Sequence, residues 1–252
     1  CLAAVRAGRD VCWIEDDNDL EPLVTVAIPT YARAEPLMAA VESALGQTYE
    51  RVEVLVIGDN TDEQSVSLIG SCRDPRVKFV NLPQQGIYPS DPSVRGLVSG
   101  SKPMNVALDL AAGAWLATCD DDDELMPDHV AHLLDAAKRR RLEFVYGQFQ
   151  EIDHAPPNLG ADVPPRITIG GNEPIRFGAV ARGAALYSMG LSFMRYDNDC
   201  WRVGDPHDWN LYKRMQLIGV RIGFEPGATY KYNRYPIESE RPPGWWNAHA
   251  VE

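Results

Sequence analysis

The sequence predicts an α/β fold in which helices cover both faces of a mostly parallel central sheet, followed by a smaller irregular region. Two patterns predict it. Across residues 24–146, short apolar runs rich in β-branched residues alternate with segments of helical periodicity, which is typical of a parallel sheet covered by helices. Residues 153–174 contain five prolines and show no such periodicity. We therefore expect an α/β region at 1–152, with a short extension at 1–22, and a second region of the same domain at 153–252.

The individual elements follow from the same periodicities. Buried strands are expected at 24–28, 52–57, 77–80 and 115–119, and Pro29 is expected to close the first of them. Helices are expected after Pro36, over 103–111 and after Pro127. In the second region we expect a helix at 208–217 and short strands at 220–224 and 229–232, while 81–101 reads as a long irregular loop.

The charge balance excludes one broad class of function. The chain carries 36 acidic and 24 basic residues and a formal net charge of -12, whereas a protein that binds nucleic acid holds the phosphate backbone with an excess of Lys and Arg. We therefore expect no nucleic-acid partner. An acidic protein that handles a phosphorylated ligand usually needs a cation between the two.

Cysteine usage and hydropathy indicate the compartment. The five cysteines are scattered without metal-type spacing, so free thiols in a reducing compartment are expected. No stretch approaches the roughly 20 apolar residues that span a bilayer, and no leader pattern is seen. We expect a cytoplasmic location and no integral membrane segment in this chain, while the oligomeric state is not readable.

An acidic run over residues 120–124 is the main candidate for chemistry. It follows the strand predicted to end at Cys119, and ligands in open α/β sheets bind beyond the carboxyl ends of strands. Its carboxylates could ligate Mg²⁺ or Mn²⁺ and leave positions open for phosphate oxygens. The alternative is a solvated cap on the helix near Pro127. A calcium loop fits less well, because Leu125 and Ala131 stand where glycine and glutamate are required.

Five sequence blocks occur together in a fixed order. They are Val-Ala-Ile-Pro-Thr-Tyr at 26–31, Ser-Ala-Leu-Gly-Gln-Thr-Tyr at 43–49, the strand at 54–59, the segment at 102–116, and the acidic run with Met-Pro-Asp at 126–128. In this order they resemble glycosyltransferase family 2, closely over about 22–145 and more weakly over 186–233. The resemblance implies a GT-A fold with a Rossmann-like sheet.

The family resemblance also implies an activity. It is that of a hexosyltransferase that inverts the anomeric carbon, with a nucleotide diphosphate sugar as donor, UDP as the expected nucleotide, and a carbohydrate or small-molecule acceptor. The cofactor would be Mn²⁺ or Mg²⁺. The first region, 1–152, would bind the nucleotide sugar, and 153–252 would supply the acceptor side and the catalytic base.

The resemblance assigns donor-side roles residue by residue. Asp59 matches the acid that contacts the nucleotide base, and Asp122 matches the metal ligand, assisted by Asp120. Ribose contact falls to Asp120 or Asp121. The remaining nucleotide-binding candidates are Pro29, Thr30, Tyr31, Arg33, Lys102 and Asn105. The chain departs from the family in having Gly58 before Asp59, and Met104 where an arginine is common. Either Lys102 or Arg95 could then supply positive charge to the diphosphate.

The acceptor side rests on residues 207–214, which resemble the family's segment for the catalytic base. Such a base must lie within hydrogen-bond reach of the acceptor hydroxyl. Asp208 is the expected base, and Asp205 is the second candidate unless it only caps a turn. His207, Trp209, Trp201 and Arg95 are candidates for acceptor or sugar contacts, although a turn histidine and core tryptophans are equally consistent with the pattern. Trp245 and Trp246 either close over the site or pack the tail.

Three competing functions fit the sequence less well. A sugar-1-phosphate nucleotidyltransferase should carry a glycine-rich basic loop after the first strand, and residues 29–34 do not fit. A catalytically idle domain that binds only nucleotide or carbohydrate is disfavoured by the presence of Asp120, Asp122 and Asp208. A serine hydrolase lacks its Gly-X-Ser-X-Gly motif here.

Overall fold

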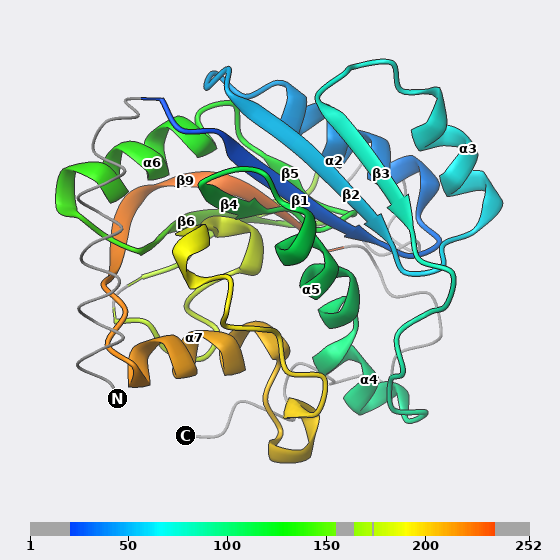
Figure 1. The fold of residues 1–252 in the computed structure, drawn as a ribbon. Coiled ribbons are helices and arrows are strands. Elements are labelled where there is room, and N and C mark those ends of the chain that lie inside the picture. Colours follow the sequence, from blue (N-terminus) through cyan, green and yellow to red (C-terminus); the bar gives the residue numbers. More distant parts are fainter. Residues whose placement is uncertain (1–20, 155–163, 173, 235–252) are drawn as a thin grey trace.

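The computed structural model describes residues 21–154, 164–172 and 174–234. Over these residues the chain forms a nine-stranded sheet in the order β3-β2-β1-β4-β8-β6-β9-β5, with β7 paired to β6 (Figure 1). The strands are β1 Val24–Thr30, β2 Val52–Gly58, β3 Val77–Asn81, β4 Trp115–Thr118, β5 Glu124–Leu125, β6 Phe144–Asp153, β7 Arg166–Gly170, β8 Ala185–Ser188 and β9 Ile222–Arg234. Trp245 and Trp246 lie outside the described residues.

The N-terminal half of the sheet is parallel, as predicted. β1 pairs in parallel with β2 and β4, and β2 pairs in parallel with β3. Every residue of β1, β2 and β4 is buried, which is what a continuous apolar run in a sheet covered on both faces requires. The four predicted strands are therefore confirmed, with ends shifted by one or two residues.

One boundary prediction was wrong, because β1 continues through Pro29 to Thr30. The carbonyl of Ala27 accepts from Cys119 N on the β4 side, so by alternation the nitrogen of Pro29 also faces that side. Pairing with β4 ends at Ala27 and Thr118. Pro29 has no N–H group to donate. Its nitrogen faces a side where no strand pairs with β1 at that residue, so the sheet loses no hydrogen bond.

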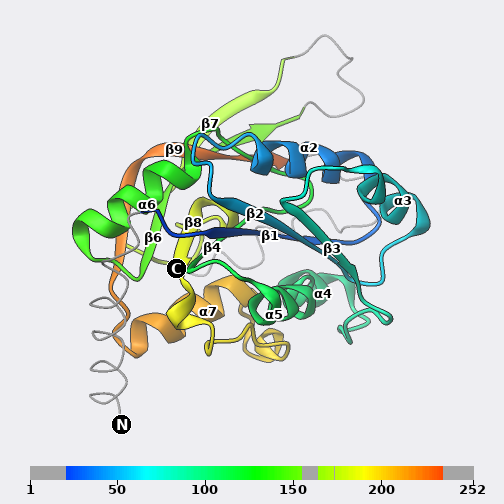
Figure 2. The same ribbon diagram turned by 45° about the horizontal axis from the view of Figure 1, so that its top comes forward.

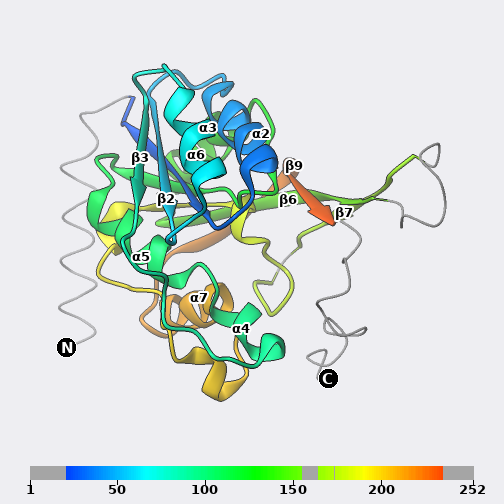
Figure 3. The same cartoon turned by 90° about the vertical axis from the view of Figure 1, so that its right-hand side faces the viewer.

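The C-terminal half of the sheet is mixed. β4 with β8, β6 with β8, β5 with β9 and β6 with β7 are antiparallel, while β6 and β9 are parallel. The two short strands predicted at 220–224 and 229–232 are one 13-residue strand, β9. Pro226 and Gly227 interrupt its sequence pattern, and the register against β6 shifts near Gln148, but pairing resumes. Figures 2 and 3 show β6 and β7 extending beyond the helical layers.

Helices cover both faces, as predicted (Figure 2). They are α2 Ala34–Leu45, α3 Glu63–Ser71, α4 Pro92–Val98, α5 Ser101–Leu110, α6 His129–Arg140 and α7 His207–Leu217, with 3-10 turns η2 Arg182–Ala184, η3 Met189–Leu191 and η4 Cys200–Val203. One core joins α2 and α6 to the sheet, and the other joins α5 and α7 to its opposite face. The fold class is thus confirmed.

Two further sequence predictions concern helices and thiols. Among the described residues, no helix combines the length and apolar character needed to cross a membrane. Cys72, Cys119 and Cys200 are free thiols.

The segment 81–101, predicted to be irregular, contains α4, whose N-cap Asp91 accepts from Ser93 N at 2.9 Å.

Gly113 allows β4 to pack beside β1. A Cβ at Gly113 would lie 2.6 Å from Thr25 N and 2.8 Å from Leu23 O, both backbone atoms that cannot rotate away. We expect Gly113→Ala to lower the free energy of unfolding by about 1–3 kcal/mol, measured by urea denaturation. Gly70→Ala is the matched control: its Cβ meets nothing within 4 Å inside α3, so it should gain up to about 1 kcal/mol. Equal stabilities for the two variants would contradict this packing.

His129 makes stability depend on pH. It is fully buried at the start of α6, with Nδ1 3.0 Å from Thr229 Oγ1, and burial lowers its pKa from 6.5 to about 4. The folded state therefore keeps His129 neutral while the unfolded chain binds a proton, so its contribution is present above pH 6.5 and is lost as pH falls toward 4. The loss should reach about 3 kcal/mol. His129→Asn should flatten this part of the stability curve, and an unchanged slope would contradict the assignment.

Candidate active site

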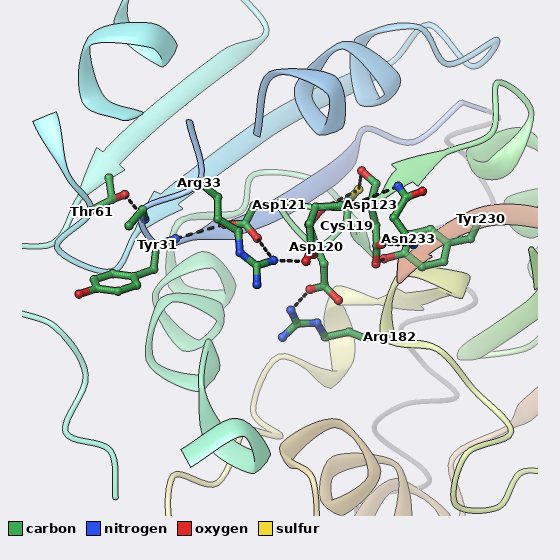
Figure 4. A network of polar contacts seen from close by, with 12 residues as sticks. Tyr31, Arg33, Thr61, Cys119, Asp120, Asp121, Asp123, Arg182, Tyr230 and Asn233 are labelled. Carbon is green, nitrogen blue, oxygen red and sulfur yellow. Dashed lines mark hydrogen bonds and ion pairs between the residues drawn. The ribbon is translucent and has the colours of Figure 1, made fainter. Parts of the chain in front are cut away.

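The acidic run and the first-strand loop meet at one edge of the sheet (Figure 4). β1 and β4 are parallel neighbours, so their carboxyl ends lie side by side. Asp120 follows β4, Tyr31 follows β1, and Tyr31 N donates to Asp121 Oδ2 at 3.2 Å. Ala32 N donates to Thr61 Oγ1 at 2.8 Å, which ties the same loop to the segment after β2. The chain thus brings three predicted donor-side segments together.

Alternate carboxylates of the run face in different directions. Asp123 is 1% exposed and accepts from the Tyr230 hydroxyl and, at 2.6 Å, from Asn233 N, so it anchors the run to β9. Asp121 is 8% exposed and accepts from Tyr31 N. The side chains of Asp120 and Asp122 are 24% and 25% exposed. Among the four aspartates of the run, Asp120 and Asp122 are therefore the ones that face outward, while the Glu124 side chain, 35% exposed, pairs with Lys231.

Two arginines balance this concentration of negative charge. Arg33 forms an ion pair with Asp122 and lies 3.4 Å from Asp121 Oδ1, and Arg182 forms an ion pair with Asp120. Burial raises the pKa of Asp121 to about 6, and Arg33 opposes that shift. Burial also raises the pKa of Asp123, assisted by the negative charge of Asp122. Each outward carboxylate thus already faces one positive charge.

The chemistry of Asp120 and Asp122 would suit a metal ion that is bound together with a phosphorylated ligand. Within the part of the chain that the structure describes, no group of three or more His, Cys, Asp or Glu side chains is placed to hold a metal. Mg²⁺, however, is commonly bound by one or two carboxylates together with substrate phosphates, and hard oxygen ligands suit Mg²⁺ and Mn²⁺. Asp122 and Asp120 supply that kind of partial site, and their role as metal ligands stays a prediction.

Asp59 is engaged by the loop that follows β3. It is 3% exposed, and it accepts from Gly86 N at 2.9 Å and from the Tyr88 hydroxyl at 2.6 Å. Its own backbone nitrogen donates to Thr30 O at 2.9 Å. Both carboxylate oxygens are therefore already bonded, so Asp59 positions this loop, and a contact with a nucleotide base stays a prediction.

The other predicted donor-side residues lie in different surroundings. Thr30 and Pro29 are buried inside β1, whereas Tyr31 is 52% exposed at its end. Lys102 Nζ donates to Gln84 O at 2.6 Å and Gln85 O at 3.3 Å. Arg95 donates to the carbonyls of Pro89 and Ser90, and Asn105 exchanges two hydrogen bonds with the backbone of Tyr196. The structure thus places Lys102 and Arg95 against the loop at 84–90, whereas Arg33 and Arg182 pair with the aspartates of the acidic run.

The two candidate bases differ in their partners. Asp205 is 9% exposed, forms an ion pair with Lys213 and accepts from Asn210 Nδ2 at 3.1 Å. Asp208 is partly exposed and accepts from Trp209 N at 2.6 Å. Burial raises the pKa of Asp208, and Arg182 opposes the shift. A carboxylate that is partly accessible and has a raised pKa suits a general base, so Asp208 remains the better candidate.

The acceptor-side aromatic and histidine candidates are all in contact with other side chains. His207 is 7% exposed, with Nε2 3.0 Å from Arg182 Nη1, and burial, assisted by Arg182, lowers its pKa well below the ordinary value. Trp209 makes an edge contact with Phe177, with ring centroids 6.3 Å apart. Arg202 lies over the Trp201 ring at 4.9 Å. Their roles toward an acceptor stay predictions.

Sequence reasoning missed Arg182 and Tyr88. Arg182 reaches Asp120 because β8, which follows η2 directly, pairs antiparallel with β4. Tyr88 reaches Asp59 through a loop with no regular pattern. No local motif marks either residue, and only the chain's long-range pairing brings them to the site.

The sequence profile of Glycosyl transferase family 2 matches residues 25–90 and 99–209. The chain belongs to this family. The matched residues of this chain include the acidic run, Arg182 and Asp208, whereas the unmatched residues 91–98 include all of α4. The predicted membership is confirmed.

Curated relatives match part of the chain. It is 31% identical over 119 residues to the succinoglycan biosynthesis protein ExoO of Rhizobium meliloti (strain 1021), covering 47% of this chain and 31% of that protein. It is 31% identical over 142 residues to the hyaluronan synthase of Pasteurella multocida, covering 55% of this chain and 13% of that protein. The chain thus spans less than a third of the length of either relative.

Two solved structures share the fold. S. aureus TarS 1-349 in complex with UDP-GlcNAc superposes with a TM-score of 0.64 at 16% identity, covering 86% of this chain and 60% of that one. The mannosyltransferase PcManGT from Pyrobaculum calidifontis, in complex with GDP-Man and Mn²⁺, gives a TM-score of 0.58 at 14% identity, covering 98% and 68%. The GT-A fold that the sequence predicted is confirmed.

Proposed function

We propose that this chain is a metal-dependent, inverting glycosyltransferase that moves a sugar from a nucleotide diphosphate, with UDP the expected nucleotide, to a hydroxyl of a carbohydrate or small-molecule acceptor. The observation that carries the proposal is the placement of the outward aspartates Asp120 and Asp122 beyond β4, with Arg182 joining Asp120 to the segment that holds Asp208. Related proteins support it: TarS is solved with UDP-GlcNAc, and PcManGT with GDP-Man and Mn²⁺.

The residues divide the reaction between them. The Asp208 carboxylate takes the proton of the acceptor hydroxyl while the oxygen of that hydroxyl bonds to the anomeric carbon. The bond from the anomeric carbon to the diphosphate oxygen breaks, and its electron pair leaves on the nucleotide diphosphate. Asp122 and Asp120 would hold Mn²⁺ or Mg²⁺, which when bound offsets the charge of the diphosphate. Arg33, at the same edge, adds positive charge beside Asp121 and Asp122.

Nucleotide binding tests the proposal directly. We would measure thermal unfolding of the chain with UDP, GDP, dTDP and CDP, each with and without Mn²⁺. At 100 times its dissociation constant, the matching nucleotide should add about 2.7 kcal/mol of stability, and only when metal is present. Stabilisation by none of the four would overturn the donor site. Metal-dependent binding without any transfer would favour the catalytically idle domain.

A further inference from the structure

Arg182 connects two parts of the site that are far apart in the sequence. Its Nη2 forms an ion pair with Asp120 of the acidic run (Figure 4). Its Nη1 lies 3.0 Å from Nε2 of His207, the residue before Asp208. The Arg182 side chain is only 11% exposed. A buried guanidinium with two polar partners of this kind is costly to desolvate and is well defined in position.

The backbone around Arg182 is held from several sides. Thr118 Oγ1, at the end of β4, donates to Arg182 O at 2.7 Å. The next residue, Gly183, lies against the Tyr230 ring so closely that a Cβ would overlap it. On the other side, a Cβ at Gly100 would lie 3.4 Å from Arg182 Nη1 and 3.7 Å from His207 Cε1. The backbone at Arg182 and Gly183 is therefore held by β4 and β9, and the guanidinium lies beside the turn before α5.

Arg182 also supplies positive charge where the other groups near Asp208 are neutral. The titratable groups that interact with Asp208 include Tyr196, Tyr212 and Cys200, and burial raises the pKa of all three, that of Cys200 to about 12. His207 stays neutral because burial lowers its pKa. Lys213 and Asn210 are engaged with Asp205. Arg182 is the cation that favours the ionised form of Asp208.

We infer that Arg182 is a positioning residue for the transfer reaction, holding His207 and the start of α7, and with them Asp208, in a fixed place relative to Asp120. The inference rests on the proposed function. In that role Arg182 acts through Asp208. Its loss should therefore change both the rate and the pH dependence of transfer.

The test compares Arg182→Gln, which removes the charge, with Arg182→Lys, which keeps it. Arg140→Gln is the matched control, because Arg140 pairs with Glu225 at 3.2 Å at the far end of α6. Arg182→Gln should lower kcat/KM for sugar transfer roughly 10- to 100-fold and move the acidic limb of the pH profile upward by about one unit. Arg182→Lys should keep the limb near its wild-type place, and Arg140→Gln should change neither.

The outcomes separate this inference from the proposed function. An Arg182→Gln protein with a lower unfolding midpoint but an unchanged pH limb and rate would mean that Arg182 is only structural. If Arg182→Gln does not fold, the Arg182→Lys variant provides the test. A wild-type rate of transfer in Arg182→Lys would overturn the inference, whereas a reduced rate with an unmoved acidic limb of its pH profile would support it. A wild-type chain that binds no nucleotide and transfers no sugar would overturn the proposed function and this inference together.

Discussion

Replacing Asp208 by Asn should lower kcat for sugar transfer by about 10²- to 10⁴-fold while leaving nucleotide binding unchanged. The substitution keeps the shape of the side chain and removes the negative charge that makes it a base for the acceptor proton. Asp208 accepts one backbone hydrogen bond, from Trp209 N, and is not tied to Lys213 as Asp205 is. The fold should therefore tolerate the change. Single-turnover assays with saturating donor would measure the chemical step.

Asp205→Asn provides the comparison for Asp208→Asn. Asp205 forms an ion pair with Lys213 and accepts from Asn210, both within α7. Its loss should lower the unfolding midpoint and change kcat by less than about tenfold, because removing the buried partner of a half-exposed ion pair acts mainly on stability. If Asp205→Asn instead loses the larger part of kcat and Asp208→Asn does not, the two assignments must be exchanged.

The parallel half of the fold was predictable because its signals are local. Each buried strand is a continuous apolar run, and each helix between them carries its own periodicity. The acidic run follows the end of β4, and the rule that ligands bind beyond the carboxyl ends of parallel strands then placed it correctly beside the loop after β1. Local sequence patterns and this rule of topology were therefore sufficient to predict which segments meet at this edge of the sheet.

The remainder depends on contacts that no local pattern encodes. α4 has only seven residues, too few for a helical periodicity to stand out, although its Asp91 cap and Pro92 are typical start signals. The bonds from Tyr88 to Asp59 and from Arg182 to Asp120 each cross between separate elements. The sequence likewise does not show which aspartates of the run are buried and which face outward. Asp123 faces inward because it accepts hydrogen bonds from Tyr230 and Asn233 of β9, which lie more than 100 residues later in the chain.

Asp122→Asn should abolish the metal-dependent part of nucleotide binding. At 100 times the wild-type dissociation constant, the variant should lose the whole gain of about 2.7 kcal/mol that nucleotide with Mn²⁺ gives the wild type. The reason is that Asp122 is one of the two outward aspartates in the run, and an amide oxygen is a far weaker ligand than a carboxylate. Thermal unfolding with and without Mn²⁺ would measure the loss.

Asp128→Asn is the matched control for Asp122→Asn, since it makes the same change of charge six residues away. Asp128 is exposed and its side chain makes no capping bond to α6, so nucleotide with Mn²⁺ should stabilise this variant as it does the wild type. Asp122 also pairs with Arg33, and its loss frees that guanidinium for the diphosphate. Nucleotide binding that survives in Asp122→Asn but no longer responds to Mn²⁺ would show that Arg33 has replaced the ion. Binding that keeps its full metal dependence would remove Asp122 from the site.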